Sequence, residues 1–452
     1  MLIFAFILPP YLQKFCYIHN TLFMKYLNYN FAENGNIFWE NKDNLYHIPK
    51  TELDETYDIV VVGGGITGLS AAYHLNNDKK ILIIDKHNIG YGGSNRNGGF
   101  CCLGGTKLSF EEIDRKYGRS DLEYFFQIQK SSIDLVENIL GKKIEKNEKG
   151  EITYYYNTKQ FNKDLRELDK YKDLLNINYE KLTFSSLKQN RQLISGAVGA
   201  IRLNYGFGIN PKNLVCSLVN KISKSENVQF LENTEVKYIK KERSNFEIEI
   251  STRKIKSKKI IIATNGYLNS KKISGRIYKN IIPALSNILV TEPIDENLFT
   301  DWKTNVLCTD NKKLLHYFRL LNDNRILFGG RGGHSYKNTT TYKIILENDF
   351  KMMFPEFNEI KFEYFWRGLV GVTYDKIAHI GMNDNKYYAY GYNGNGVSLS
   401  TFFGKLLAEL IDEKITLDEL PKCVTSFPKS MNFPILKRFY LFLAYQFYGL
   451  KG

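Results

Sequence analysis

The chain has 452 residues, of which 43% are hydrophobic and 24% are charged, so it is long enough for two or three domains with a large core. No apolar run reaches the roughly 18 residues that a membrane-spanning helix needs, and the six cysteines are too few and too irregularly spaced for a disulfide framework. The net charge of +14 is compatible with a nucleic-acid surface. However, the lysines are spread along the chain, as in Lys240–Lys241 and Lys254–Lys259. This spread favours solvated loops, and we expect no nucleic-acid partner.

Residues 1–49 are predicted to be a leader and an N-terminal arm. The first ten residues, MLIFAFILPP, are apolar but short, and Pro9 and Pro10 interrupt them. They lack a basic start and a small-residue cleavage site, which a secretory signal would have. Met24 begins a more polar stretch. We therefore expect residues 1–23 to be dispensable; a membrane anchor or a signal is the alternative.

The segment Tyr57–Leu75, YDIVVVGGGITGLSAAYHL, combines an apolar β-branched run, a glycine triplet and an Ala-rich helical pattern. The next apolar run ends at an acid, about 20 residues after the first glycine. This is the strand–turn–helix–strand layout of a dinucleotide-binding unit, in which the helix N-terminus faces the pyrophosphate and the acid binds a ribose hydroxyl. The alternative is a glycine-rich turn in an ordinary α/β domain. The contacts predicted here are Gly63, Gly65, Ile66, Thr67, Gly68, Asp85 and Lys86.

A second glycine-rich stretch, Gly90–Gly99, follows that acid. Its glycines suit neither a helix nor a strand, but they suit an extended loop against a flat ligand. FAD continues past the first strand–helix unit and needs such a loop, whereas a nicotinamide cofactor has no evident need for it. We therefore predict FAD, with contacts from Gly93, Ser94, Arg96, Asn97, Gly98 and Gly99.

Two distant segments support FAD. Ile260–Gly266 is a buried type of strand that ends in a small-residue turn, and Gly391–Val397 is another glycine cluster. The cluster opens a helical pattern over Ser398–Ile411, so its N-terminus is predicted to return to the same cofactor; a plainly capped helix is the alternative. The cofactor contacts predicted in the later part of the chain are Val236, Ala263, Thr264, Gly266, Gly394, Asn395, Gly396 and Val397.

Together these motifs resemble the FAD-dependent amino-acid and amine oxidase family, which includes D-amino-acid, glycine and sarcosine oxidases. The motifs IGYGGSNRNGG, HYFRLLNDNRILFGG, GYNGNGVSLSTFFGKLLAEL and LPKCVTSFP are most similar to the gamma-glutamylputrescine oxidoreductase branch. The resemblance covers the chain from about residue 38 to its end. Asn395 stands where that branch usually has His. Some relatives attach the flavin through Cys or His, but the Gly90–Gly99 loop has no His and nothing singles out Cys308, so we expect noncovalent FAD.

The expected fold class is α/β, with a discontinuous Rossmann-like FAD-binding domain and a second domain built on an antiparallel sheet. Residues 50–110, 205–270 and 375–415 are predicted to form the first domain, and residues 111–204 and 271–374 the second. Residues 416–452 are predicted to be a tail that packs on the body. The local signals are a Ser109–Glu112 capping box, an Asn210 cap before Pro211, and a hairpin, Leu314–Leu320 with Arg325–Gly329.

The resemblance implies that the chain oxidises the CH–NH bond of an amine or amino acid by hydride transfer to flavin N5, after which the imine is hydrolysed. The residues expected to face the substrate are Tyr317, Arg319, Trp366 and Asn395. Tyr317 and Arg319 share one side of a predicted strand and would hold a carboxylate. The alternatives are a surface Tyr–Arg pair and a core Trp. The histidines show no metal-ligand spacing, so we expect no metal.

Two other functions stay open at this point. The segment Phe433–Tyr448 is aromatic, basic and apolar, so a membrane-associated dehydrogenase that passes electrons to quinone is one alternative, with peripheral membrane contact. An RNA-modifying flavoprotein is the other, suggested by charge alone. The main prediction is a cytoplasmic enzyme whose partners are a small-molecule amine or amino acid and oxygen or another electron acceptor.

Overall fold

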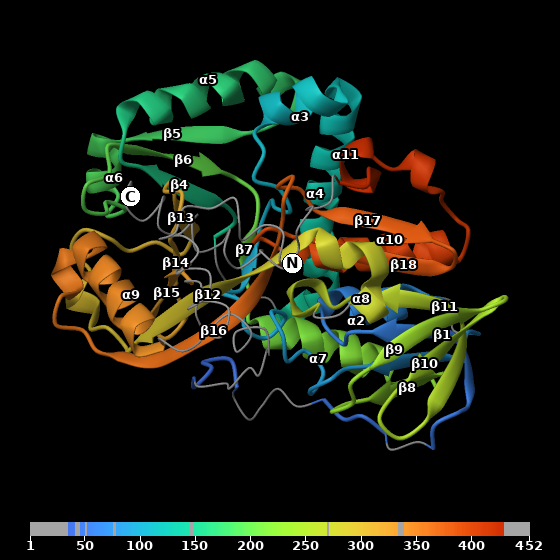
Figure 1. Cartoon of the computed structure of the whole chain (residues 1–452). Helices are drawn as coiled ribbons and strands as arrows, with labels where there is room; N and C mark the ends of the chain where they lie inside the picture. Colours follow the sequence, from blue (N-terminus) through green and yellow to red (C-terminus); the bar gives the residue numbers. More distant parts are fainter. Residues whose placement is uncertain are drawn as a thin grey trace, which may run out of the picture. The chain divides into compact units, whose positions relative to one another are not determined.

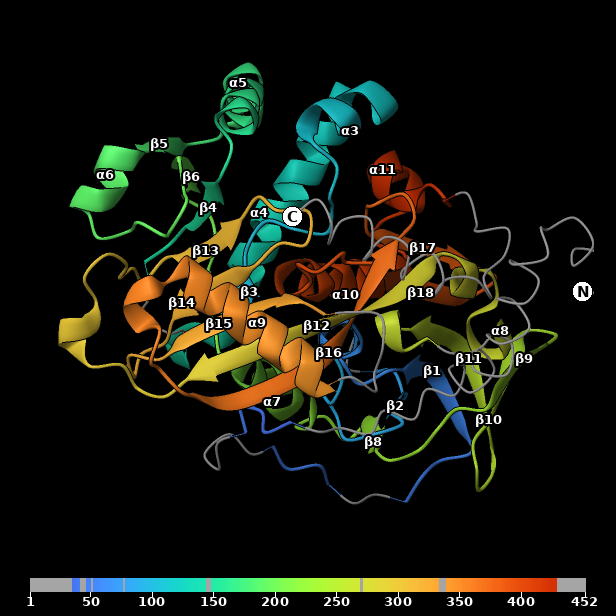
Figure 2. The ribbon, with the colours of Figure 1, turned by 60° about the vertical axis from the view of Figure 1, so that its left-hand side comes forward.

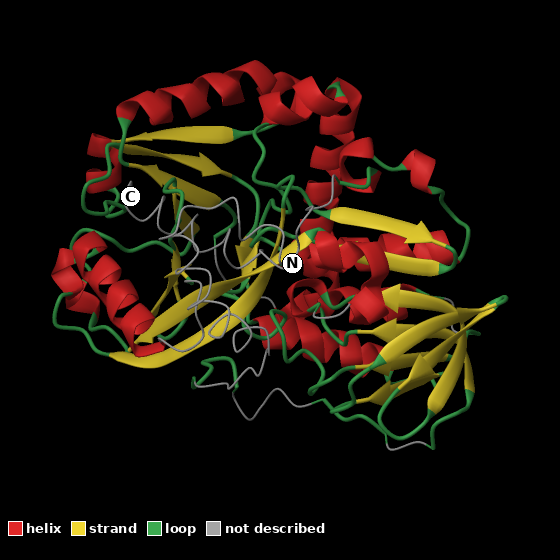
Figure 3. Cartoon of the chain, viewed as in Figure 1, coloured by secondary structure: helices red, strands yellow, loops and turns green. Residues whose placement is uncertain are grey.

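The computed structural model describes residues 35–40, 46–49, 52–75, 78–143, 148–268, 271–332 and 339–428, all within one compact unit. The predicted leader, residues 1–23, and the segment Phe433–Tyr448 lie outside the described residues. Two eight-stranded sheets organise the described chain, and Figure 3 shows their strands as two separate groups.

The first sheet has a parallel centre with the strand order β17-β18-β11-β1-β2-β8, and β10 and β9 extend from β11 as antiparallel strands (Figure 1). Its central strands are short, β-branched and almost fully buried, as expected for a sheet covered on both faces. The strands are β1 (Thr56–Val62), β2 (Ile81–Ile84), β8 (Val228–Leu231), β9 (Tyr238–Glu242), β10 (Asn245–Glu249), β11 (Lys254–Ile262), β17 (His379–Asn383) and β18 (Lys386–Tyr390).

The helices that pack with this sheet are α2 (Ile66–His74), α4 (Arg119–Leu140), α7 (Pro211–Ile222) and α10 (Val397–Ile411). Helices α2 and α10 lie in close contact because Gly404 lacks a side chain: a Cβ there would lie 2.6 Å from the Thr67 carbonyl oxygen. The Ser70 hydroxyl donates to the Thr401 carbonyl at 2.6 Å across the same contact. This packing brings the N-terminal turn of α10 to the first dinucleotide unit.

The second sheet is mainly antiparallel, with the order β16-β12-β15-β14-β13-β4-β6-β5. Helix α9 (Thr339–Met353) packs on its outer face through a cluster of aromatic side chains (Figure 2). The strands are β4 (Glu151–Tyr155), β5 (Tyr179–Thr183), β6 (Gly199–Leu203), β12 (Ile281–Thr291), β13 (Leu307–Asp310), β14 (Tyr317–Leu320), β15 (Ile326–Arg331) and β16 (Phe362–Thr373).

The opposite face of this sheet, which we call the inner face, contacts the Gly90–Gly99 loop. The Trp366 indole donates to the Arg96 carbonyl at 3.1 Å. A Cβ at Gly98 would lie 2.8 Å from the ring of Tyr317. The strand register places these side chains on the inner face together with Glu151, Thr153, Ser286, Thr309 and Arg319.

Several predicted elements are confirmed. Ser109 and Glu112 form a reciprocal capping box at the start of α3 (Phe110–Tyr117), and Asn210 caps α7, which begins at Pro211. Strands β14 and β15 form the predicted hairpin. The division into two domains stays a prediction. Helix α4 lies in the range assigned to the second domain, but it packs against α10 and α7.

Candidate functional site

The functional site lies at one edge of the first sheet. Strands β1, β2, β8, β11 and β18 are parallel, so their carboxyl ends meet at this edge. Ligands of open α/β sheets bind at this position. The segments that follow these strand ends include nearly all of the predicted cofactor residues, together with one acid that the sequence did not single out, Glu232.

The glycine triplet joins β1 to α2 as predicted. Gly63 has φ +111°, and a Cβ at Gly68 would lie 2.1 Å from the Gly63 carbonyl oxygen, so both positions require glycine. Gly65 is the N-cap of α2 and offers no side-chain cap, while Ile66 and Thr67 begin the helix in buried positions. The Ser94 hydroxyl accepts from the Ile66 N–H at 2.9 Å. The helix N-terminus is thus built for an anion.

Asp85 and Glu232 end neighbouring strands and hold the loops around them. Asp85 accepts from the Gly64 N–H at 2.8 Å and from the His87 N–H at 2.9 Å. Burial raises the pKa of Asp85 to about 6, despite these bonds, and the Glu232 charge adds to the rise. Glu232 accepts from the Ile89 N–H at 2.6 Å and from the Tyr46 hydroxyl at 2.9 Å. Glu232 could have been found from the sequence, because it directly follows an apolar run, β8, as Asp85 directly follows β2.

Lys86 and Val236 lie at the margin of the site. The Lys86 ammonium pairs with Glu235 at 3.0 Å, with both side chains about half exposed. Val236 is buried. Lys86 therefore has a protein partner at the surface, and its predicted contact with the cofactor stays a prediction.

The Gly90–Gly99 loop is fixed by its own polar side chains. Asn97 donates to the Gly93 and Ser94 carbonyls at 3.0 and 2.8 Å and accepts from the Gly99 N–H at 2.8 Å. Arg96 is buried and donates to the Tyr91 carbonyl at 2.9 Å, with its guanidinium over the Tyr91 ring. Arg96 and Asn97 thus shape the loop, and the predicted contacts of Gly93, Ser94 and Gly98 with the cofactor stay predictions.

The later cofactor segments reach the same edge. The Ala263 N–H donates to the Val62 carbonyl at 2.8 Å, which sets Thr264 beside the glycine triplet. Among the described residues, the buried Thr264 hydroxyl has no hydrogen-bond partner. Gly266 packs against Gly371.

The loop before α10 is the last of these segments. Gly394 has φ +106° and is exposed, and a Cβ there would have no atom within 4 Å. Gly396 is the N-cap of α10 and Val397 its first residue, and no side chain caps the helix. The first turn of α10 therefore keeps N–H groups for negative charge.

These features fit FAD. The α2 N-terminus and the glycine backbone suit the pyrophosphate, and the remaining lone pairs of Asp85 suit a ribose hydroxyl. Among the described residues, the Thr264 hydroxyl has no hydrogen-bond partner and Gly394 has no atom within 4 Å of a Cβ, so a polar group and space are available to a ligand there. The α10 N-terminus suits the electron-rich end of the flavin ring.

Tyr317, which is predicted to face the substrate, lies on the inner face of the second sheet. Its hydroxyl lies 2.9 Å from that of Ser286, and its ring contacts Phe100 edge-on with 5.4 Å between the ring centroids. Burial raises the pKa of Tyr317 to about 12. At neutral pH this phenol is therefore a hydrogen-bond donor and acceptor and does not act as a base.

Arg319 does not join Tyr317 in a carboxylate clamp. Its side chain is 1% exposed, and its guanidinium donates to the Gly98 carbonyl at 3.1 Å and to the Ile209 carbonyl at 2.8 Å. The guanidinium also lies over the Trp39 ring. These contacts connect the second sheet to the Gly90–Gly99 loop, so Arg319 is a positioning residue here and the expected clamp needs revision.

Trp366 and Asn395 are also held by backbone groups. Trp366 is fully buried and its indole donates to the Arg96 carbonyl, so it holds the Gly90–Gly99 loop against the second sheet. The Asn395 amide donates to the Leu103 carbonyl at 3.4 Å, and its Cβ packs against Gly104. Asn395 thus joins the loop before α10 to the chain that leaves the Gly90–Gly99 loop.

Sequence reasoning missed three further residues around the site. Trp39 is buried, and its indole donates to the Asn97 carbonyl at 2.9 Å. Ser286 and Glu151 lie on the inner face of the second sheet, where their hydrogen-bond partners are Tyr317 and Thr309. Neither stands in a recognisable motif, because these partners are distant in sequence.

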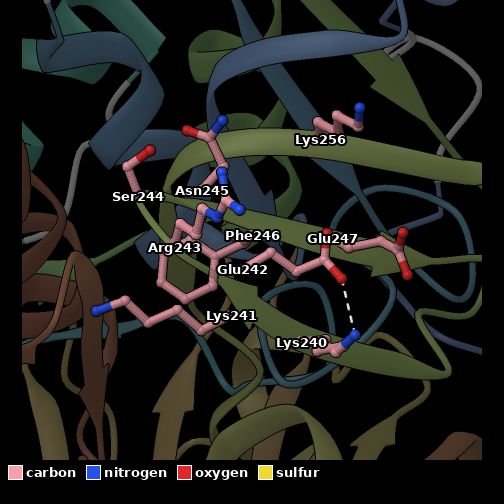
Figure 4. A pocket seen from close by; sticks show the side chains of 9 residues that line it. All are labelled: Lys240, Lys241, Glu242, Arg243, Ser244, Asn245, Phe246, Glu247 and Lys256. Atoms are coloured by element: carbon pink, nitrogen blue, oxygen red, sulfur yellow. Dashed lines mark hydrogen bonds and ion pairs between the residues drawn. The ribbon is translucent and has the colours of Figure 1, made fainter.

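A separate surface pocket lies on the β9–β10 hairpin and not at the carboxyl edge (Figure 4). Two of its three lysines have acidic partners: Lys240 pairs with Glu242 at 2.8 Å and Lys241 with Asp384 at 3.0 Å. The hairpin therefore carries mixed charge and does not form a basic patch of one sign.

The described residues lack two kinds of feature. None of their helices is long and apolar enough to cross a membrane. No group of three His, Cys, Asp or Glu side chains among them could hold a metal ion.

The sequence is similar to named bacterial oxidoreductases. It is 27% identical over 407 residues to "Probable oxidoreductase OrdL" of Haemophilus influenzae, covering 87% of this chain and 92% of that protein. It is 26% identical over 390 residues to the gamma-glutamylputrescine oxidoreductase of Escherichia coli, covering 84% and 89%.

Solved structures share the fold. Glycine oxidase from Geobacillus kaustophilus superposes with a TM-score of 0.69 at 18% identity, covering 83% of this chain and all of that chain. L-proline dehydrogenase from P. horikoshii gives a TM-score of 0.67 at 21% identity, covering 82% and 96%. The family model described as DAO, FAD dependent oxidoreductase, matches residues 58–410. The chain therefore belongs to the DAO family of FAD-dependent oxidoreductases, whose members act on amines and amino acids.

Proposed function

We propose that the chain oxidises the CH–NH bond of a primary or secondary amine whose carboxylate lies away from the reacting carbon, as in a γ-glutamylated diamine. The observation that carries this proposal is the hydroxyl pair of Tyr317 and Ser286, 2.9 Å apart beside Gly98 of the cofactor loop. Both groups are neutral at pH 7, since burial raises the pKa of Tyr317 to about 12. Arg319, the expected carboxylate partner, is bound to backbone carbonyls. The name of the Escherichia coli relative agrees with such a substrate.

The chemistry follows from the cofactor and the neutral surroundings. Bound FAD supplies the oxidant, because its ring N5 accepts a hydride from the carbon that bears the amine. The substrate C–H bond would break with its electron pair going to the flavin, and the nitrogen lone pair would form the C=N bond. Water would then hydrolyse the imine to a carbonyl compound and an amine or ammonia. The Tyr317 and Ser286 hydroxyls are suited to orient a neutral amine. The α10 N-terminus is suited to stabilise negative charge.

Flavin bleaching under nitrogen tests the proposal. Purified yellow protein should lose its flavin colour with γ-glutamylputrescine more readily than with glycine, proline or D-alanine. Admission of oxygen should restore the colour and form hydrogen peroxide if oxygen is the acceptor; a quinone analogue should be needed if it is not. Bleaching by α-amino acids but not by amines would contradict the proposed substrate class.

The two other functions gain no specific support. The segment proposed to lie on a membrane, Phe433–Tyr448, is outside the described residues. In the β9–β10 hairpin, Lys240 and Lys241 pair with acidic side chains. The proposed function is therefore that of an amine oxidoreductase.

A further inference from the structure

Three polar side chains around the start of α10 bind one short stretch of backbone, residues 102–105, which follows the Gly90–Gly99 loop and which we call the 102–105 segment. All three donate to backbone carbonyls of this segment. The bonds run from the Ser398 hydroxyl to Cys102 at 2.7 Å, from the Asn395 amide to Leu103 at 3.4 Å and from the Asn393 amide to Gly105 at 3.3 Å. The start of α10 is therefore attached to the chain that leaves the cofactor loop.

The 102–105 segment approaches α10 closely because it contains two glycines. A Cβ at Gly104 would lie 2.4 Å from the Asn395 Cβ, and a Cβ at Gly105 would lie 2.1 Å from the Leu399 Cδ2. Neither position has room for a side chain. Glycine at both positions thus lets the segment lie directly on the loop before α10 and on the first turn of the helix.

Asn393 is held by the largest number of bonds. It is 4% exposed and has φ +54°, in the left-handed region that asparagine tolerates better than most residues. Its Oδ1 accepts from the Thr373 N–H at 3.0 Å, and its Nδ2 donates to the Gly391 carbonyl at 2.6 Å as well as to Gly105. Its own N–H donates to the Gly371 carbonyl at 3.1 Å. Because the N–H of Thr373 only donates and the carbonyl of Gly391 only accepts, the amide has one orientation.

The asparagine and serine side chains are of types that often cap helices, yet none of them caps α10. At an N-cap, such side chains accept from N–H groups of the first helical turn. The N-cap of α10 is Gly396, and no side chain caps this end. Asn395 and Ser398, which flank Gly396, donate instead to the 102–105 segment. The first turn of α10 is therefore fixed in place while its N–H groups stay available for negative charge.

We propose that Asn393, Asn395 and Ser398 are positioning residues for the flavin: they hold the uncapped N-terminus of α10 at the cofactor site and thereby favour reduced over oxidised FAD. The chain belongs to a family of FAD-dependent oxidoreductases, so FAD is its cofactor. Reduced flavin gains negative charge, and a fixed helix N-terminus stabilises such charge better than one that can move. The inference concerns the cofactor of this chain and goes beyond the proposed substrate.

The reduction potential of the bound flavin tests this proposal, because it measures how much more tightly the protein binds reduced than oxidised FAD. Ser398→Ala removes the shortest of the three bonds, and Asn395→Ala removes the amide but keeps the Cβ against Gly104. The double variant should lose about tenfold of the preference for reduced FAD, which lowers the potential by about 30 mV for a two-electron couple. Anaerobic titration of the purified holoenzyme with a reference dye measures this shift. An unchanged potential would overturn the proposal.

Two matched controls keep the residue type but lack the contact with the 102–105 segment. Ser400→Ala removes a hydroxyl of the same helix that donates to the Val397 carbonyl, at 3.4 Å. Asn385→Ala is the control for Asn393→Ala, because Asn385 is exposed and has φ +61°, so both variants place alanine in the left-handed region. Asn393→Ala should lower the potential, whereas both controls should keep that of the unmodified protein. Controls that lower it equally would contradict the proposal.

The affinity for oxidised FAD separates positioning from a general structural role. Titration of each apoprotein with FAD gives this affinity directly. A purely structural role predicts that both redox states bind more weakly by the same factor, which leaves the potential unchanged; the proposal predicts a larger loss for the reduced state. Should the double variant not fold, Ser398→Ala alone decides the question, because it removes one oxygen atom.

Gly104→Ala gives an independent test, because it removes no polar group. The added Cβ cannot fit beside Asn395, so it should separate the 102–105 segment from the loop before α10. The flavin potential should fall as it does in Ser398→Ala. A potential that falls in neither variant would reject the role of this contact, whatever amine the enzyme oxidises.

Discussion

Arg319 has contacts that differ from those expected of a substrate-binding arginine. On a strand beside a tyrosine, a guanidinium is a natural partner for a substrate carboxylate. In the fold, the same guanidinium lies against the Gly98 and Ile209 carbonyls, both of which come from the cofactor half of the chain. The guanidinium thereby connects the Gly90–Gly99 loop to the second sheet.

Replacing Arg319 with Ala should therefore reduce stability and flavin retention before it affects substrate choice. Two buried carbonyls lose their donor, at a cost of about 1–3 kcal/mol each. Urea unfolding at a fixed FAD concentration should show this loss, and the flavin spectrum should change because the Gly90–Gly99 loop is released. If Arg319→Ala kept its stability and its spectrum but bound substrate more weakly, the original carboxylate clamp would be restored.

Asp85 should make FAD binding depend on pH. Burial raises the pKa of this carboxyl to about 6 in the protein without ligand. A ribose hydroxyl donates more strongly to the ionised form, so FAD binding favours loss of the proton. The dissociation constant of FAD should be constant above about pH 7 and should rise as the pH falls through about 6.

The control for this prediction is Asp85→Asn, which keeps the shape of the side chain but cannot titrate. Its FAD affinity should be lower at neutral pH and nearly flat between about pH 5 and 7. A pH dependence that persists unchanged in Asp85→Asn would assign the effect to another group.

At the scale of elements, the segment around Ile37–Trp39 supports the cofactor loop from outside the predicted domain. Trp39 and Ile37 are buried, and Asn36 forms a bridge with Phe365 of β16. The Trp39 indole bonds to the Asn97 carbonyl and packs against Trp366. These residues belong to the range expected to be a leader and arm, but part of that range is core.

Truncation should divide this arm into dispensable and required parts. A chain that starts at Met24 keeps residues 35–40 and should fold and bind FAD, whereas a chain that starts at residue 46 should lose flavin. Trp39→Ala in the full chain should cost about 3–5 kcal/mol, as for other buried aromatic truncations. Phe38→Ala is the matched control and should cost less, because this ring is only partly buried. Normal flavin content in the residue-46 chain would refute a role for the arm.

The elements that the sequence predicted are those with local signals. The Ser109–Glu112 capping box, the Asn210 cap and the Gly63–Gly68 turn depend on neighbours within a few residues, and each forms as expected. The partners of Arg319, by contrast, lie 221 and 110 residues away, at Gly98 and Ile209. The pairing of distant strands decides such contacts, and a strand pattern read from one sequence does not specify it.

The same limit separates the glycine-rich segments, which were predictable, from the inner face of the second sheet, which was not. Dinucleotide sites are built mainly from backbone groups and glycines, which leave spaced motifs in the sequence. The inner face combines single side chains from β4, β12, β13 and β14. Ser286 was missed for this reason, since its hydroxyl meets that of Tyr317 only once β12 and β14 both pair with β15.

On the scale of the whole molecule, the second sheet joins α9 through a charged centre on its outer face. His316 is 1% exposed, with its ring nitrogens 2.7 Å from Asp310 and 3.2 Å from Asp349 of α9. The ring also stacks on Phe328. Burial lowers the pKa of His316, but the hydrogen bonds and charges of both carboxyl groups outweigh it, so the net pKa is raised.

This centre should make the folded protein less stable in alkaline solution. A histidine whose folded pKa exceeds its unfolded value, near 6.5, contributes its full stability below about pH 6.5, and this contribution is lost as the pH rises through the raised folded pKa. Asp85, with a pKa of about 6, has largely finished titrating below that window. The unfolding free energy at fixed FAD should therefore decrease from neutral pH upward.

His316→Asn should remove this decrease and also lower stability at neutral pH by about 3–5 kcal/mol, because Asp310 and Asp349 would lose their buried cation. His47→Gln, at an exposed position, is the matched control and should keep both the stability and its dependence on pH. Urea unfolding across about pH 6 to 9 would measure both slopes. If His316→Asn retained the slope of the unmodified protein, the pH dependence would arise from another group.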